Sequence, residues 1–204
     1  MKQILFKNKL FYLLNKIKKI FYNSKKNYHL GEFGEDIFVR RFFQKKEKGF
    51  YVDVGCYHPI KGSLTHSLYK KKWKGLNIDL SSVSIDLFKL SRSKDFNIQA
   101  AITDFDGKTF YYENSPINQQ NSLDKNNGIK KEIDAYKLNT ILDKFNINKI
   151  DYLNIDAEGN DNKVISSFDF IKYKPQLISI EFNSYGNKKL LTSEVHTCMT
   201  KNRY

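Results

Sequence analysis

Three short apolar segments of this 204-residue chain each end in a carboxylate, and this pattern limits the fold more than any other feature. A short apolar run is typical of a strand buried in a parallel sheet. The acids are Asp53 in Phe-Tyr-Val-Asp-Val-Gly, Asp79 in Leu-Asn-Ile-Asp and Asp156 in Leu-Asn-Ile-Asp-Ala-Glu. Open α/β sheets bind ligands beyond the carboxyl ends of their strands. The sequence therefore predicts a doubly wound, mostly parallel α/β sheet with these acids gathered at one edge.

Helical and strand signals alternate along the chain, which predicts crossover connections and a parallel sheet. Strands are predicted over 50–54, 75–79, 97–102, 109–112, 150–155 and 176–182. Helices are predicted over 34–43, 63–71 with Ser63 as N-cap, 82–91, 138–145, 161–168 and 188–201. Residues 114–130 are rich in Asn, Gln, Ser and Gly, and they predict an excursion that is a lid, a substrate contact or a disordered loop.

The N-terminal region is basic, with eight lysines and no acid in residues 1–31. Apolar residues recur at helical spacing over 3–24, which predicts an amphipathic helix that either adsorbs on an anionic membrane or docks on protein. We therefore predict a helical extension, 1–29, and one domain, 30–204. Although the net charge is +13, the domain lacks a dense basic stripe, and nucleic acid is not predicted as a partner.

The lack of a recognisable targeting signal and the small number of cysteines favour a cytoplasmic protein. The chain has only two cysteines, no run of about 20 apolar residues and no cleavage site typical of a signal peptide. We predict a cytoplasmic location, with residues 3–24 as the candidate for peripheral contact at the inner face of the membrane.

The loop after the first predicted strand favours a cofactor smaller than a dinucleotide. It contains Gly55 and then no glycine until Gly62, so the closely spaced glycines of a nicotinamide enzyme are missing. Gly55 would allow close approach of the backbone to a cofactor with an amino-acid tail, or it would serve only a tight turn. Asp79 would accept hydrogen bonds from both hydroxyls of a ribose, or it would cap the segment Ser81–Ser84.

Candidate groups for chemistry follow the first and last of these strands. Asp156 and Glu158 could hold a divalent cation, orient a hydroxyl or accept its proton; in the alternative, Glu158 caps the next helix. His58 is a candidate base or a structural hydrogen-bonding residue. Cys56 is predicted to pack beneath a cofactor rather than to act as a nucleophile. His196 and Cys198 have no further ligands at metal spacing, so no zinc site is predicted.

Several ordered blocks of the chain resemble the FkbM family of S-adenosylmethionine-dependent methyltransferases. The resemblance extends over about residues 30–182. The blocks are Gly31-Glu-Phe-Gly-Glu-Asp36, Gly49-Phe-Tyr-Val-Asp-Val-Gly-Cys-Tyr-His-Pro59, Ser63-Leu-Thr65, Trp73-Lys-Gly-Leu-Asn-Ile-Asp79, Ile150-Asp-Tyr-Leu-Asn-Ile-Asp-Ala-Glu-Gly159 and Lys174-Pro-Gln-Leu-Ile-Ser-Ile-Glu181.

The resemblance implies a class I methyltransferase fold and transfer of a methyl group to a hydroxyl of a sugar, a glycan or a polyketide-like secondary metabolite. It also implies roles for individual residues. Asp53 and Gly55 would line the methionine end of S-adenosylmethionine, Ser63 and Thr65 would bind its carboxylate, Asp79 its ribose, Asp156 with Glu158 would lie at the reacting end, and Glu181 would face the acceptor.

The chain departs from the family pattern after Glu181, where 23 residues remain. They are too few for the antiparallel hairpin that completes the sheet in the family, so we expect a truncated chain or a partner that covers the last strand. A second hypothesis is therefore a non-catalytic adapter with a decayed methyltransferase fold in a membrane-associated complex for glycan assembly.

Overall fold

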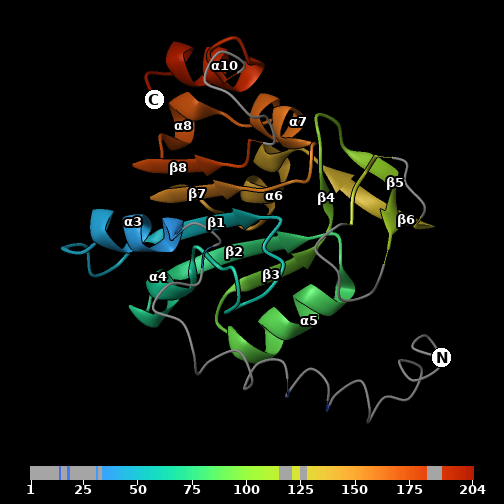
Figure 1. Cartoon of the computed structure of the whole chain (residues 1–204), viewed down its shortest axis with the longest axis horizontal. Coiled ribbons are helices and arrows are strands. Elements are labelled where there is room, and N and C mark those ends of the chain that lie inside the picture. Colours follow the sequence, from blue (N-terminus) through green and yellow to red (C-terminus); the bar gives the residue numbers. More distant parts are fainter. Residues whose placement is uncertain are drawn as a thin grey trace.

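The computed structural model describes Leu14, Lys18, Gly31 and residues 34–114, 121–124, 128–182 and 190–204. Its centre is a five-stranded parallel sheet with strand order β3-β2-β1-β7-β8 (Figure 1). The strands are β1 Phe50–Val54, β2 Lys74–Asp79, β3 Phe96–Gln99, β7 Tyr152–Ile155 and β8 Leu177–Ile180. Strands β2 and β3 are added on one side of β1, and strands β7 and β8 are added later on its other side. The predicted doubly wound α/β fold is therefore confirmed, with its switch point between β1 and β7.

Helices cover both faces of this sheet. Successive side chains of a strand point to opposite faces, so both faces present side chains against which helices can pack. Val52 and Val54 of β1 belong to the main core, to which α6, α7 and α8 contribute. Tyr51 points to the other face, where it packs with residues of α3 and α4, and α5 lies against β2 and β3. The helices are α3 Glu35–Phe42, α4 His66–Lys70, α5 Ser82–Ser91, α6 Leu138–Lys144, α7 Asp161–Ser166 and α8 Phe170–Tyr173.

A second, three-stranded sheet lies beside the first and was only partly predicted. It has the order β4-β6-β5, with β4 Ala101–Ile102, β5 Gly107–Glu113 and β6 Ile129–Tyr136. The predicted strand 97–102 is therefore wrong as one element: the amide of Ala100 still donates to Asp79, whereas that of Thr103 donates to Tyr136 in the second sheet. Strand β6 was missed, because its first four residues are exposed and its apolar alternation is weak. Strands β5 and β6 are antiparallel, so the sheets are not parallel throughout.

Several helix limits differ from the predictions. Helix α5 matches the predicted range, but α4 has Thr65 rather than Ser63 at its N-cap, and neither hydroxyl caps it. The predicted helix 161–168 ends at Ser166, and a separate short helix, α8, follows it.

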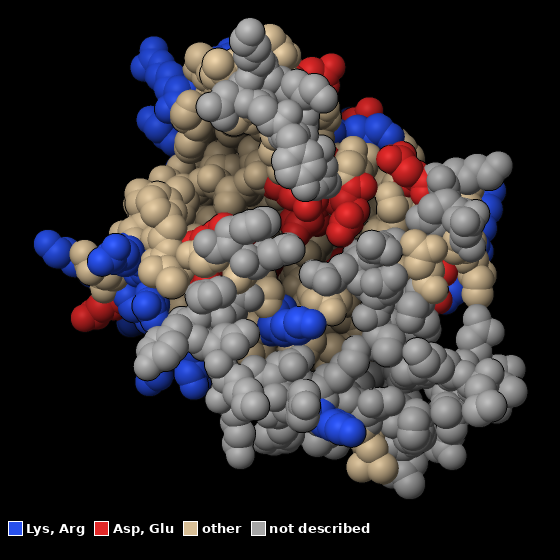
Figure 2. All heavy atoms as spheres, in the orientation of Figure 1, with Lys and Arg blue, Asp and Glu red and all other residues tan. Residues whose placement is uncertain are grey.

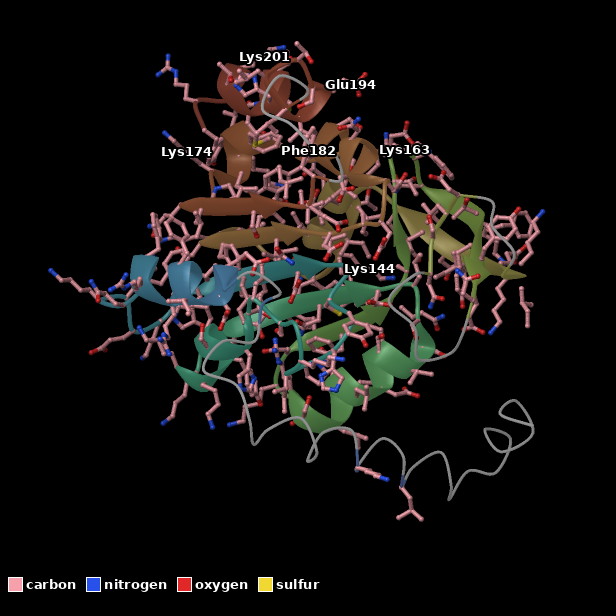
Figure 3. The ribbon with its side chains drawn as sticks, viewed as in Figure 1. Lys144, Lys163, Lys174, Phe182, Glu194 and Lys201 are labelled. Atoms are coloured by element: carbon pink, nitrogen blue, oxygen red, sulfur yellow. The ribbon has the colours of Figure 1, made fainter. Side chains whose placement is uncertain are left out.

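The last helix, α10 Glu194–Lys201, begins later than predicted, with the Ser193 side chain accepting from the His196 amide. Figure 3 labels Glu194 and Lys201 at the two ends of this helix. Asn162 Nδ2 of α7 donates to Glu194 at 2.9 Å, and Val195, Cys198 and Met199 pack against the main core. Helix α10 therefore adds to the layer on the α6–α8 face.

The predicted N-terminal helix, 3–24, lies outside the described residues, apart from Leu14 and Lys18, which are helical and exposed. Among the described residues, no helix combines the length and apolar character that a membrane crossing needs.

Candidate active site

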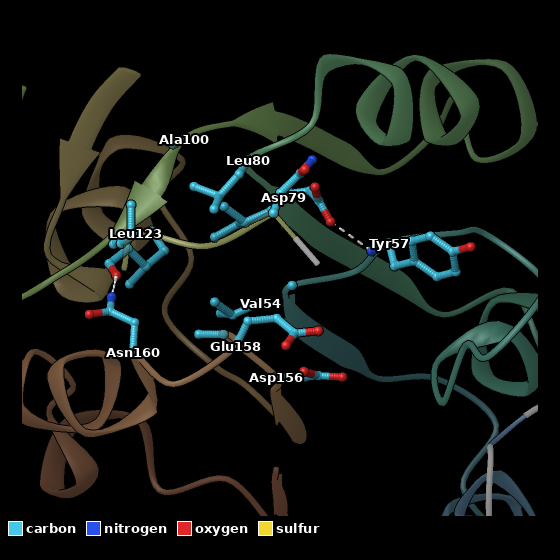
Figure 4. A pocket seen from close by; sticks show the side chains of 14 residues that line it. Val54, Tyr57, Asp79, Leu80, Ala100, Leu123, Asp156, Glu158 and Asn160 are labelled. Carbon is cyan, nitrogen blue, oxygen red and sulfur yellow. Dashed lines mark hydrogen bonds between the residues drawn. The ribbon is translucent and has the colours of Figure 1, made fainter. Parts of the chain in front are cut away.

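A pocket opens at the carboxyl ends of β1, β2 and β7, at the switch point of the central sheet (Figure 4). It encloses about 650 Å³, including the part that is open to solvent. Its lining residues are Val54, Gly55, Tyr57, Ile78, Asp79, Leu80, Ala100, Ile102, Asn121, Leu123, Asp156, Ala157, Glu158 and Asn160.

Gly55 allows the loops after β1 and β7 to meet at this pocket. Its φ angle is +78°, in the region that glycine alone adopts without strain. A Cβ atom built on Gly55 would lie 1.7 Å from the carbonyl oxygen of Asp156. The need for glycine is therefore both conformational and steric, and the predicted close approach is to the protein's own backbone.

Asp79 is held by two backbone amides while it lines the pocket. Its Oδ2 accepts from the Tyr57 amide at 2.8 Å and its Oδ1 from the Ser81 amide at 2.7 Å. Burial raises the pKa of Asp79 to about 6, although both hydrogen bonds oppose this shift. Each carboxylate oxygen has a second lone pair, so the local capping bond and a ligand contact are compatible.

A second acidic group lies across the pocket from Asp79. Figure 4 shows the carboxyl groups of Asp156 and Glu158 beside each other, below Asp79. Burial raises the pKa of Asp156 well above the usual value, and the neighbouring carboxyl of Glu181 raises it further by hydrogen bonding and repulsion. Burial, Glu181 and Asp161 also raise the pKa of Glu158. Figure 2 shows acidic side chains grouped in the central hollow of this face.

Asp161 fixes the loop that carries this acidic group. Its Oδ1 accepts from the Ala157 amide at 2.8 Å and its Oδ2 from the Gly159 amide at 3.3 Å. Glu158 has a φ of +48°, which is unusual for a residue other than glycine. The N-cap of α7 is Asn160, so the alternative in which Glu158 caps this helix is wrong.

The remaining wall of the pocket is apolar. Leu80, Ala100, Ile102 and Leu123 line it. Leu123 comes from the predicted excursion, of which residues 115–120 and 125–127 lie outside the described residues. The hydroxyl of Ser122 donates to the Glu158 carbonyl at 3.2 Å, which connects this segment to the acidic wall.

Several predicted site residues do not line this pocket. Asp53 is buried, and it accepts hydrogen bonds from Thr65 at 2.7 Å and from Asn154 at 2.9 Å. The hydroxyl of Ser63 contacts that of Thr65 at 3.2 Å. The structure thus groups Gly55, Asp79, Asp156 and Glu158 around the pocket and places Asp53, Ser63 and Thr65 in a separate buried network.

The two candidate side chains of the first loop also lie away from the pocket. His58 is buried, and its Nδ1 accepts from the amides of Ile60 and Lys61 at 3.0 and 2.9 Å. Since Nδ1 accepts both bonds, it carries no proton and shapes the loop. Cys56 is buried in a cluster with Ile85 and Phe88, as the packing interpretation predicted.

Sequence reasoning missed Tyr57, Asn121 and Asn160 at this site. The Tyr57 contribution is its backbone amide, which no side-chain pattern identifies. Asn160 Nδ2 donates to the Ile102 carbonyl at 2.7 Å and joins the acidic loop to β4. Among the described residues, no three His, Cys, Asp or Glu side chains are arranged to hold a metal ion.

A five-stranded parallel sheet flanked by helices, with an acidic pocket at its switch point, defines a class I methyltransferase-like α/β protein. The sequence matches the model of the Methyltransferase FkbM domain over residues 53–204, most of the chain. The chain therefore belongs to the FkbM methyltransferase family, as the resemblance predicted. Searches of curated proteins and of solved structures found no match.

Proposed function

We propose that this protein is an S-adenosylmethionine-dependent O-methyltransferase that acts on a hydroxyl of a sugar, a glycan or a related secondary metabolite. One observation carries the proposal: the Asp79 carboxylate lies in a pocket with an apolar wall on one side and the carboxyls of Asp156 and Glu158 on another. This arrangement suits a ligand with a flat apolar end, a ribose and a cationic end.

The lining residues fit the three parts of that cofactor. The apolar wall, formed by Leu80, Ala100, Ile102 and Leu123, would contact the adenine. Asp79 would accept hydrogen bonds from the ribose hydroxyls, since the Tyr57 and Ser81 amides and the Ser84 side chain leave part of the acceptor capacity of its carboxylate for a ligand. Among the lining residues that the structure describes there is no Lys or Arg, so the acidic wall favours a cation.

The cofactor would supply an electrophilic methyl group on a sulfonium. The residues of the chain would align and deprotonate the acceptor, and alignment is worth the most in such a displacement. Glu158 can accept a hydrogen bond from an acceptor hydroxyl. The raised pKa values of Glu158 and Asp156 make their ionised forms stronger bases than ordinary carboxylates, and such base assistance contributes roughly 10² to 10⁴ in rate. His58 has no part in this proposal, because it does not line the pocket.

Calorimetry with S-adenosylhomocysteine tests the cofactor assignment. We expect micromolar binding to the wild-type chain and none to Asp79→Ala, with exposed Asp104→Ala as the matched control. An adapter with a decayed fold would give no heat with the wild-type chain.

Methyl transfer tests the reaction and the acceptor class. Transfer from labelled cofactor to a cell-envelope glycan fraction should vanish in Asp79→Ala and persist in Asp104→Ala. Undiminished transfer by Asp79→Ala would contradict the ribose assignment. Label that reaches protein or lipid amines but no glycan would contradict the proposed acceptor.

A further inference from the structure

Arg92, directly after α5, is a fully buried cation whose donors are directed to the first loop. Its side chain donates to Thr65 Oγ1 at 2.8 Å, Ser63 Oγ at 2.9 Å and the carbonyl of Pro59. It also donates to the Tyr51 hydroxyl at 3.0 Å. Since a buried guanidinium is costly unless its donors are satisfied, these four bonds make the loop conformation and the Arg92 position depend on each other.

The network continues from Arg92 into the central sheet. Thr65 accepts from Arg92 and donates its own proton to Asp53 Oδ2 at 2.7 Å. The other oxygen of Asp53 accepts from Asn154 Nδ2 at 2.9 Å, and Asn154 in turn accepts from the Ser179 hydroxyl. The chain of hydrogen bonds thus connects the end of α5 with β1, β7 and β8.

The strand register explains how these polar groups meet. One polar residue from each strand occupies the same row across the whole sheet, in the order Asn97, Asn77, Asp53, Asn154 and Ser179. Asp53 and Asn77 are almost completely buried. A polar row inside a parallel sheet is stable only with paired hydrogen bonds, and such a network specifies one arrangement of its members.

This row lies directly before the residues that build the pocket. Asp53 precedes Gly55 by two residues, and Asn154 precedes Asp156 by two residues. The Asp53–Asn154 hydrogen bond therefore joins β1 and β7 just before the segments that follow these strands leave the sheet and approach each other at the pocket.

We propose that Arg92 is a positioning residue for the pocket. It fixes loop 55–65 and, through Thr65 and Asp53, it sets where the backbone leaves β1 and β7 to line the pocket at Gly55 and Asp156. The proposal rests on the proposed function only for the identity of the ligand. Arg92 is not among the residues that line the pocket, so it acts through the loop and not by contact. Electrostatics agree with this role, because burial raises the pKa of Asp53 while Arg92, Thr65 and Asn154 oppose the shift.

Hydrogen exchange of the ligand-free chain tests the positioning role without the cofactor. In Arg92→Met, amides of residues 57–63 should exchange about tenfold faster, while those of β1 and β7 change less than twofold. Exposed Arg40→Met on α3 is the matched control and should leave both regions unchanged. An equal rise in the loop and in the strands would overturn the proposal, because Arg92 would then only stabilise the fold.

Thr65 provides a second variant in case Arg92→Met does not fold. Thr65→Val keeps the side-chain volume but removes the bridge, so it should accelerate exchange over 57–63, and Thr65→Ser should restore the wild-type rate. Wild-type exchange in Thr65→Val would also overturn the proposal.

Binding of S-adenosylhomocysteine gives the functional readout. We expect at least about tenfold weaker binding for Arg92→Met and Thr65→Val, and wild-type affinity for Thr65→Ser and Arg40→Met. Wild-type affinity in both Arg92→Met and Thr65→Val would contradict the positioning role. If the wild-type chain does not bind this ligand, the proposed function fails, and the exchange comparison still decides the role of Arg92.

Discussion

The carbonyl oxygen of Asp156 occupies the space that a Cβ atom at position 55 would need, 1.7 Å from its ideal position. Gly55 directly follows β1 and Asp156 directly follows β7, so this contact joins two segments about 100 residues apart in the sequence. The pocket depends on it, because both residues line the cavity.

The Gly55–Asp156 contact makes Gly55→Ala strongly disruptive. We expect a loss of more than about 2 kcal/mol in the free energy of unfolding, and no binding of S-adenosylhomocysteine, since strain at positive φ adds to a clash with backbone. Gly62→Ala is the matched control, because Gly62 has a φ of +72° with no atom within 4 Å of the added Cβ. It should lose only about 1 kcal/mol in denaturant unfolding. Equal losses for the two variants would show that the loops can separate.

The ionisation of Asp79 predicts how cofactor affinity depends on pH. Its pKa is raised to about 6, so the carboxylate that accepts ribose hydroxyls is lost as pH falls below 6. The affinity for S-adenosylhomocysteine should be constant between pH 7 and 8 and fall by up to about tenfold per pH unit below 6. Calorimetry at several pH values measures this, with circular dichroism to verify folding. Asp79→Asn should bind weakly with a flat profile, and equal wild-type affinity at pH 5 and 7.5 would refute the assignment.

The contact of Asp156 with Glu181 predicts a conflict between stability and activity. Because the pKa of Asp156 is raised in the folded chain, the folded chain keeps a proton on this carboxyl at pH values where the unfolded chain has already released it. Stability from this group is therefore present at low pH and lost as pH rises through the raised pKa. Asp156→Asn keeps a donor toward Glu181 at all pH values, so its Tm should exceed the wild-type value by about 2–4 °C at pH 9 and equal it at pH 5.

Above the raised pKa of Asp156, methyl transfer by Asp156→Asn should be about 10² or more below that of the wild type, because the wild-type carboxylate can accept a proton there and the amide cannot. Exposed Asp104→Asn serves as the control for both measurements. Wild-type transfer by Asp156→Asn would show that Asp156 is not the base, and no gain in Tm at pH 9 would show that Asp156 and Glu181 do not share a proton.

Asp161 predicts a functional effect of a residue that does not line the pocket. Without its bonds to the Ala157 and Gly159 amides, the loop that presents Glu158 should loosen. We expect Asp161→Ala to lower methyl transfer about tenfold and stability by about 1 kcal/mol. Asp169→Ala removes a similar pair of amide bonds at the start of α8, at the same cost in stability but with unchanged transfer. Equal transfer by the two variants would show that the loop order is unimportant for the reaction.

The sequence was sufficient for the central sheet and for part of the site. Strand β1 and helix α5 have the predicted limits, because a run of apolar residues or a capped helical pattern is a local property. Gly55, Asp79, Asp156 and Glu158 were found for a similar reason: each ends or follows a buried strand, and the carboxyl ends of parallel strands share one edge.

The second sheet was beyond the reach of local pattern. Strand β6 has exposed charged residues at four of its eight positions and buries only Ile133 and Ala135, so pairing with β5 and β4 defines it more than its own apolar pattern does. Likewise, the division of 97–102 into β3 and β4 depends on which neighbour accepts each amide.

The destinations of Asp53, Ser63 and Thr65 were fixed by folding and could not be read from the chain. The resemblance to the FkbM family placed all three near a cofactor, but in the folded protein their polar atoms face Arg92 and Asn154. These partners lie up to about 100 residues away, and a polar side chain carries no local mark of the partner it will meet. Apolar periodicity determines which segments are buried, whereas the three-dimensional register determines which buried polar groups satisfy one another and which remain for a ligand.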